Sequence, residues 1–243
     1  MENIELNMDE RIDEIASSGV KIIQSREVFS FSIDAILLAR FPRLPKRGKI
    51  VDLCAGNGAV GLFASSKTNA QIIELEIQER LADMATRSIE LNGLTDRMSV
   101  INDNLNRALD HLHTSSADLI FCNPPYFKVD SDESHLNESH ELTTNLDEIF
   151  SVSKKLLKTN GHIAMVHRPE RFLEIVDKMR ANNLQPKWIQ FVYPKANQPA
   201  NILLIDAIKD GKEGGEIFLP PLIVHNDDGT YTDEIDEIYY GKH

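Results

Sequence analysis

Short apolar runs alternate along the chain with longer segments in which apolar residues recur every three or four positions. A short run bounded by polar residues is typical of a buried strand, and the longer spacing is typical of an amphipathic helix. Strands alternating with helices predict an α/β fold, with a mostly parallel sheet and helices on both faces. The expected strands are 49–54, 71–76, 98–102, 117–122, 162–167, 187–193 and 201–208, and the expected helices are 58–66, 78–92, 146–159 and 169–182.

Small residues mark the expected ends of two helices. Gly93 follows segment 78–92 and suits the left-handed residue that comes after a helix C-terminus. We expect Asn160 and Gly161 to end the helix before the fifth strand in the same way.

The chain is expected to have two parts. Residues 1–45 form an N-terminal extension that packs on the larger domain, residues 46–243. Within the extension we expect a hairpin of Val20–Gln24 with Glu27–Phe31, followed by a helix.

Composition narrows the class of protein. A chain of 243 residues is long enough for one α/β domain with a substantial core. No apolar run approaches the length of a membrane span, and the acidic start Met1–Glu5 does not resemble a signal peptide. The 2 cysteines give no disulfide framework, so we expect a cytoplasmic protein without a membrane partner.

A glycine-rich turn follows the first strand of the larger domain. Gly56, Gly58 and Gly61 fit the pattern G-x-G-x-x-G, in which backbone closely approaches a ligand. Glu76, at the end of the next strand, can accept hydrogen bonds from ribose hydroxyls. The pattern alone leaves two ligands open, a nicotinamide or flavin dinucleotide and S-adenosylmethionine.

Two further acids favour S-adenosylmethionine. Asp52 precedes the glycines, where a carboxylate is unfavourable beside a pyrophosphate but compatible with a sulfonium and an amino group. Asp103, followed by Asn104, ends the third strand and can accept a hydrogen bond from an adenine amino group.

The fourth strand ends in Asn123-Pro124-Pro125-Tyr126. Proline donates no hydrogen bond to a sheet, so this peptide is expected to be a rigid turn at the carboxyl edge, where open α/β sheets bind ligands. The Asn123 amide oxygen and the Pro124 carbonyl can accept the two N–H groups of a planar amine, and Tyr126 can stack on its ring. Pro125 and Phe127 are further candidates for contact with the substrate.

These motifs resemble the class I S-adenosylmethionine-dependent methyltransferases, and within them the amino-methyltransferases that carry Asn-Pro-Pro-Tyr. Segments 29–41, 139–141, 161–171 and 220–224 are similar to the bacterial tRNA adenine-N6 methyltransferases that modify a valine tRNA beside its anticodon. The resemblance implies a Rossmann-like fold of seven strands in the order 3-2-1-4-5-7-6, with the last strand antiparallel. It also implies that Asp34 lies in a segment closing over the cofactor. One departure is Ser139, where that family usually has Arg before a His-Glu pair.

The resemblance makes tRNA the expected partner, although the net charge of −12 opposes binding to phosphates. Two basic clusters, at 40–49 and between 154 and 195, are candidate RNA surfaces. The loop 127–144 is a candidate substrate lid, and its 2 histidines lack the further ligands that a metal site needs.

Other functions stay open at this point. A glutamine side chain fits the same turn, as in the release-factor glutamine methyltransferases, and so does an adenine of DNA. Two alternatives from other classes are a dinucleotide oxidoreductase and a catalytically silent S-adenosylmethionine-binding module.

Overall fold

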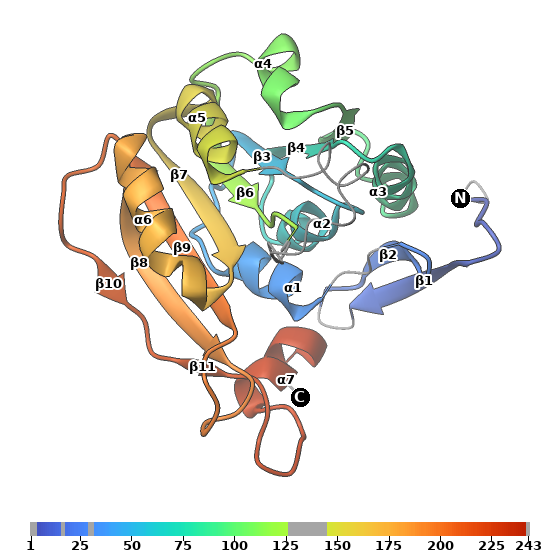
Figure 1. The fold of residues 1–243 in the computed structure, drawn as a ribbon. Coiled ribbons are helices and arrows are strands. Elements are labelled where there is room, and N and C mark those ends of the chain that lie inside the picture. Colours follow the sequence, from blue (N-terminus) through green and yellow to red (C-terminus); the bar gives the residue numbers. More distant parts are fainter. Residues whose placement is uncertain (1–3, 16–17, 29–31, 126–144, 242–243) are drawn as a thin grey trace, which may run out of the picture.

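A central sheet of nine strands forms the middle layer of the protein (Figure 1). The computed structural model describes residues 4–15, 18–28, 32–125 and 145–241. The sheet order is β10-β8-β9-β7-β6-β3-β4-β5, and β11 also pairs with β8. The strands are β3 (Lys49–Leu53), β4 (Gln71–Glu76), β5 (Met98–Asn102), β6 (Ala117–Cys122), β7 (Leu157–His167), β8 (Leu184–Tyr193), β9 (Ile202–Lys209), β10 (Ile217–Phe218) and β11 (Leu222–Ile223).

The sheet confirms the α/β class and the strand order implied by the resemblance. β3 through β7 are mutually parallel, and β9 runs antiparallel to both β7 and β8. The seven expected strands therefore lie in the order 3-2-1-4-5-7-6. The two strands beyond these seven, β10 and β11, are two residues each and pair with β8.

Helices cover both faces of the sheet. Apolar residues of α1, α2 and α7 share one buried cluster, and those of α4, α5 and α6 share a second on the opposite face. The helices are α1 (Ile33–Arg40), α2 (Ala59–Ser65), α3 (Glu79–Leu91), α4 (Ala108–His111), α5 (Leu146–Leu156), α6 (Phe172–Ala181) and α7 (Asp233–Tyr240), with short 3-10 turns η1 (Leu105–Arg107) and η2 (Pro169–Arg171).

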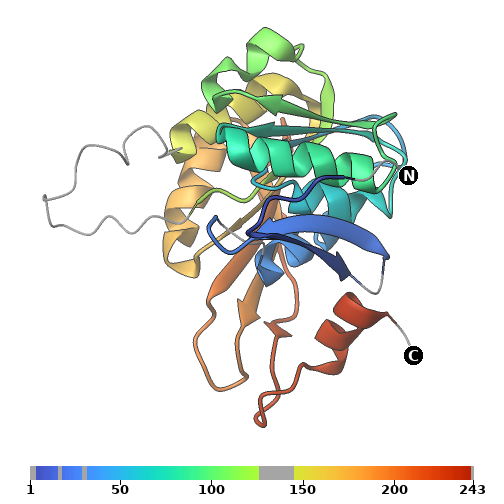
Figure 2. The same ribbon diagram turned by 90° about the vertical axis from the view of Figure 1, so that its right-hand side faces the viewer.

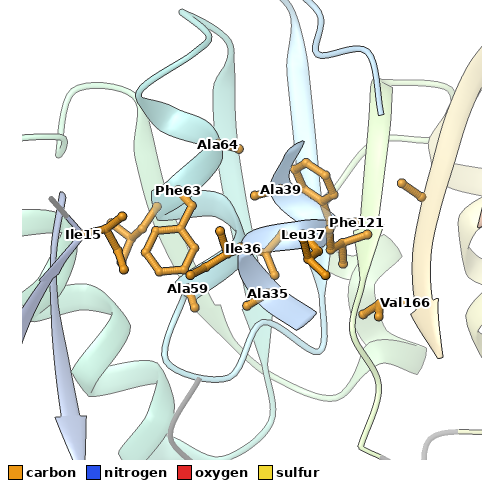
Figure 3. Packing of buried hydrophobic residues seen from close by; sticks show 14 of the residues in the cluster. Ile15, Ala35, Ile36, Leu37, Ala39, Ala59, Phe63, Ala64, Phe121 and Val166 are labelled. Carbon is orange, nitrogen blue, oxygen red and sulfur yellow. The ribbon is translucent and has the colours of Figure 1, made fainter. Parts of the chain in front are cut away.

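Figure 3 shows why α1, although it precedes the first strand of the sheet, is part of the core. Its side chains Ile36 and Leu37 lie between Phe63 of α2 and Phe121 of β6. Both α1 residues are at most 3% exposed. Burying one such side chain contributes about 1.5–3 kcal/mol, so α1 is fixed by packing and not by its own eight residues.

The helix end at Gly93 is confirmed. Gly93 has φ 64°, its N–H donates to Glu90 O at 2.9 Å, and the Leu94 N–H donates to Ile89 O at 3.0 Å. This pair of bonds satisfies the last carbonyls of α3 in the manner of a Schellman motif.

The expected helix end at Asn160 and Gly161 is wrong. α5 already ends at Leu156, and both residues lie within β7. The pairing of β6 with β7 skips from Ala117–Leu157 to Leu119–His162, and Asn160 takes φ 62° in this bulge. The left-handed residue therefore serves a strand irregularity and not a helix end.

The N-terminal hairpin has a partner other than the expected segment 27–31, of which residues 29–31 lie outside the described residues. Val20–Ser25 (β2) pairs antiparallel with the preceding segment Glu10–Ile15 (β1). Figure 2 shows this hairpin lying along α3. The Ile23 N–H donates to Ser88 Oγ of α3 at 2.9 Å, and Asn57 Nδ2 donates to Ile23 O at 3.1 Å, so β2 is tied to the body of the protein.

Within the described residues, no helix is long and apolar enough to cross a membrane.

Candidate active site

The candidate site lies at the carboxyl edge of the sheet, where four parallel strands end side by side. Leu53 of β3 pairs with both Leu75 of β4 and Cys122 of β6, and Glu76 of β4 pairs with Asn102 of β5. The segments that follow these strands carry the glycine turn, Glu76, Asp103 and Asn123. The topology thus brings four segments that are far apart in sequence to one edge.

The glycine turn is open on one side and closely packed on the other. Gly56 and Gly58 have φ of 58° and 80°, which L-residues rarely adopt. A Cβ added at Gly56 would have no atom within 4 Å, whereas one at Gly58 would lie 3.1 Å from the Ala85 Cβ. A ligand can therefore reach the backbone at Gly56, while Gly58 lets α2 pack against α3.

Glu76 connects this turn to the end of β4. Its carboxylate accepts the Gly56 N–H at 2.8 Å and the Gln78 N–H at 2.9 Å. Burial raises the pKa of Glu76, and these backbone N–H groups oppose that shift. The Ile77 N–H also reaches this carboxylate. A carboxylate has about four acceptor positions, so at least one remains for a ribose hydroxyl.

Glu76→Ala should weaken binding of S-adenosylhomocysteine by about 1–2 kcal/mol, because ribose hydroxyls lose an acceptor and the glycine turn loses its tie. Isothermal calorimetry measures this. Glu79→Ala, which removes an exposed carboxylate at the start of α3, is the matched control and should bind as the wild type does. Equal affinity of both variants would contradict this role.

Asp103 and Asn104 follow β5 and are held by local contacts. The Asp103 carboxylate lies 2.7 Å from His111 Nε2 and 3.4 Å from an Arg107 nitrogen. Its bond to His111 is the main cause of a lowered pKa, so Asp103 is ionised at neutral pH. The Asn104 side chain accepts the Asn106 N–H at 2.8 Å and caps η1.

Asp34 lies in the first turn of α1, where its charge complements the helix dipole. Tyr239 of α7 is close enough for this charge to help raise the pKa of the tyrosine hydroxyl, although burial is the larger cause. The start of α1, which carries Asp34, therefore lies near the C-terminal helix α7.

Asp52 is fully buried and faces a partner that the sequence analysis missed, Glu74. Among the described residues, no hydrogen-bond donor reaches any of the four carboxyl oxygens, and the two buried groups are close enough to shift each other's pKa. Burial raises the pKa of Asp52 to about 7 and that of Glu74 well above its usual range. The pair therefore shares a proton beneath the glycine turn. An acid between Ile73 and Leu75, in the middle of a predicted buried strand, was the sequence signal that could have singled out Glu74.

This shared proton predicts how stability depends on pH. Because both pKa values are raised in the folded protein, the folded state binds protons more tightly than the unfolded state does. The contribution of this pair to folding stability is fully present below about pH 4, the carboxyl pKa in the unfolded chain. It is lost as pH rises through about 7, the pKa of Asp52 in the folded protein. Urea unfolding at pH 5 and pH 8 should show wild type losing more stability over this interval than Asp52→Asn. The control Asp96→Asn, at an exposed site, should follow wild type. An Asp52→Asn variant with the wild-type pH slope would contradict the shared proton.

The Asn-Pro-Pro turn begins directly after β6. Asn123 is half-buried, Pro124 is buried and Pro125 is exposed. Tyr126 and Phe127 lie outside the described residues, as do Ser139 and the expected lid 127–144.

His167, at the end of β7, is a second residue that the sequence analysis missed. The pairing of Cys122 with Met165 places it beside the Asn-Pro-Pro turn. Its Nδ1 accepts the Arg168 N–H at 2.7 Å, and burial is the main cause that lowers its pKa to about 4. His167 is therefore a neutral imidazole at physiological pH. The rule that strand ends carry the site could have found it.

Comparison with known proteins agrees with this geometry. The family model described as "Methyltransferase small domain" matches residues 19–183. A tRNA1(Val) (adenine(37)-N6)-methyltransferase from Parabacteroides distasonis is 27% identical over 177 residues, which cover 71% of this chain and 74% of that protein. One from Actinobacillus pleuropneumoniae serotype 5b is 25% identical over 214 residues, covering 84% of this chain and 86% of that protein. A solved structure of a predicted O-methyltransferase from Agrobacterium tumefaciens has a TM-score of 0.71 at 22% identity, covering 86% of this chain and 96% of that one.

The sheet order, the glycine turn and the acid at the end of β4 define a class I methyltransferase with a Rossmann-like fold. The chain belongs to the methyltransferase small domain family. It is an S-adenosylmethionine-dependent enzyme, and the dinucleotide oxidoreductase left open by the glycine pattern is excluded.

Proposed function

We propose that this enzyme methylates the exocyclic N6 amine of an adenine in tRNA, next to the anticodon of a valine tRNA. The observation that carries the proposal is the Asn-Pro-Pro turn at the end of β6, beside the glycine turn at the end of β3. The names of the relatives from Parabacteroides and Actinobacillus support the same substrate.

The cofactor is expected to contact the open side of the glycine turn at Gly56 and Gly58, with Glu76 on its ribose. Asp103 and Asn104 are proposed to hold its adenine, and Asp34, Asp52 and Asn123 complete the expected set. The proposed role of Asp52 is indirect: its carboxyl group faces Glu74, so it supports the glycine turn and does not itself contact the cofactor. When bound, S-adenosylmethionine supplies an electrophilic methyl group.

The residues of the turn activate a weak nucleophile. The lone pair of an adenine amine is delocalised into the ring, so the amine must be made more tetrahedral. Asn123 Oδ1 and the Pro124 carbonyl are proposed to accept its two N–H groups, which directs the lone pair outward. Positive charge develops on this nitrogen, and fixed carbonyl dipoles stabilise that charge more in the transition state than in the ground state. Pro124 and Pro125 restrict the backbone that holds these acceptors.

Tyr126 is proposed to stack on the base, and Phe127 to line the pocket. A base within folded RNA must leave its stack to enter such a pocket.

The structure divides the basic residues between the two edges of the sheet. Lys49 begins β3, and the cluster at 40–49 precedes it, so this cluster lies at the amino edge, away from the Asn-Pro-Pro turn. Lys158 pairs with Asp118 at the start of β6, on that same edge. Arg168 and Lys195 instead follow the carboxyl ends of β7 and β8.

Charge reversal at the carboxyl edge should therefore weaken tRNA binding most. The variant Arg168→Glu with Lys195→Glu should lower affinity and flatten the dependence of log Kd on log salt by roughly one unit per lost phosphate contact. The matched control, Arg43→Glu with Lys46→Glu, reverses two charges at the amino edge and should have a smaller effect. Filter binding at several salt concentrations measures both. A larger effect of the control pair would place the RNA on the opposite edge.

The runner-up function is methylation of a protein glutamine, because its side-chain amide also presents an NH2 group to two carbonyl acceptors and the net charge of −12 does not favour RNA. The deciding assay offers unmodified valine tRNA transcripts and a release-factor peptide bearing glutamine to the same enzyme. We expect N6-methyladenosine in the tRNA, detected by mass spectrometry of nucleosides. Methylation of the peptide but not of the tRNA would reverse the assignment.

A further inference from the structure

The only two cysteines in the chain meet at the site. Cys54 directly follows β3, and Cys122 is the last residue of β6, the neighbouring parallel strand. Their side chains are in hydrogen-bonding contact. Cys122 also directly precedes Asn123, and only Ala55 separates Cys54 from Gly56 of the glycine turn.

The backbone brings the two sulfur atoms to the same side. Leu53 is the pairing partner of Cys122, so in a regular strand Cys54 would point to the opposite face. Cys54 instead takes φ 62°, a left-handed conformation that ends the strand and turns its side chain toward Cys122. Strands about 4.8 Å apart and a rise of about 3.3 Å per residue separate the two Cα atoms by roughly 6 Å. Disulfides span Cα separations of about 4.4–6.8 Å.

The two thiols differ in their surroundings. Cys54 is half-buried and Cys122 is fully buried. Burial, with the contact to Cys54, raises the pKa of Cys122 well above its usual range, so this sulfur stays a thiol at neutral pH. A small oxidant in solvent therefore meets Cys54 first, and Cys122 is the sulfur already in place to react with the product.

We propose that Cys54 and Cys122 form a reversible disulfide that switches off cofactor binding when a hydroperoxide oxidises the enzyme. The Cys54 sulfur attacks the peroxide, which breaks the O–O bond, gives a sulfenic acid and releases an alcohol, or water from hydrogen peroxide. The Cys122 sulfur then attacks the Cys54 sulfur, the S–O bond breaks, and the thiol proton leaves with hydroxide as water. In total, two thiols and one hydroperoxide give one disulfide, one alcohol and one water.

The disulfide would constrain both the glycine turn after β3 and the Asn-Pro-Pro turn after β6. The residue after Cys54, Ala55, donates its N–H to Leu75 O at 3.0 Å, so a shift of Cys54 is transmitted to the turn that carries Gly56. On the other side, a shift of Cys122 moves the peptide that begins Asn123. Disulfides inside reducing compartments are usually transient and redox-sensing, in agreement with a switch.

The test treats the purified full-length enzyme with hydrogen peroxide and follows three measurements. Peptide mapping without reductant should show residues 54 and 122 cross-linked with the loss of two hydrogen atoms. A thiol assay should fall from two free thiols to none. Calorimetry should show at least a tenfold loss of affinity for S-adenosylhomocysteine, which dithiothreitol restores.

Two variants separate this chemistry from general oxidative damage. Cys122→Ala should retain a Cys54 sulfenic acid that dimedone traps, and Cys54→Gly, which suits the left-handed conformation, should keep its cofactor affinity in peroxide. Dimers linked through cysteine on a non-reducing gel, or a 54–122 disulfide that leaves affinity unchanged, would overturn the proposal. The thiol and cross-link measurements do not depend on the identity of the methyl acceptor, so the proposal can fail or hold apart from the tRNA assignment.

Discussion

Asn123→Ala should lower the single-turnover rate of methyl transfer by roughly a hundredfold or more, the usual cost of removing one preorganised acceptor of developing charge. The amide oxygen is proposed to hold the substrate amine. Affinity for S-adenosylhomocysteine should therefore stay within about threefold of wild type.

Rapid-quench measurement with saturating cofactor isolates the methyl-transfer step, and calorimetry gives the affinity. The matched control is Asn69→Ala, which truncates an exposed asparagine in the loop before β4, at the amino edge. This variant should keep the wild-type rate. If Asn123→Ala retains more than about a third of the wild-type rate, the Asn-Pro-Pro turn has a structural role and not a catalytic one.

Gly61→Ala should destabilise the fold by about 2–3 kcal/mol, in the upper range for overpacking a core. A Cβ at this position would lie 2.0 Å from Glu74 Oε1, far inside contact distance. Glu74 is fully buried, so its carboxyl group cannot move aside into solvent. Alanine favours a helix over glycine by about 1 kcal/mol, which reduces the loss but does not cancel it.

Urea unfolding measures this change, and a double-mutant cycle assigns its cause. Glu74→Ala removes the oxygen that the new methyl group would strike. Adding Gly61→Ala to that background should therefore cost at least about 1 kcal/mol less than adding it to wild type. Equal costs in both backgrounds would show that the glycine is required for another reason.

The local pattern of the sequence predicted the seven longer strands of the sheet, the helices α2, α3, α5 and α6, and the edge that carries the site. It did not predict β1, α7 or the short elements α4, β10 and β11. Apolar runs and helical spacing located the sheet strands, because each element must bury one face or stripe whatever its neighbours are. Successive strands of one sheet that are joined by helices are parallel, so their carboxyl ends meet. The sequence alone therefore predicts that the residues after β3, β4, β5 and β6 lie at one edge. The order of those strands came from resemblance and not from periodicity.

Pairing and direction were decided only by the tertiary structure. The sequence could not show that β2 pairs with β1, because either neighbouring segment could supply the hydrogen bonds and packing on α3 selects between them. Nor could it show that Asp52 faces Glu74, because that contact depends on the register of two strands. The basic residues at 40–49 belong to the edge opposite the Asn-Pro-Pro turn, although they are near the glycine turn in sequence. Local spacing determines which face of its own helix or strand a residue occupies. The side chains that it contacts on that face are determined by strand register and direction, and these depend on residues far away in the sequence.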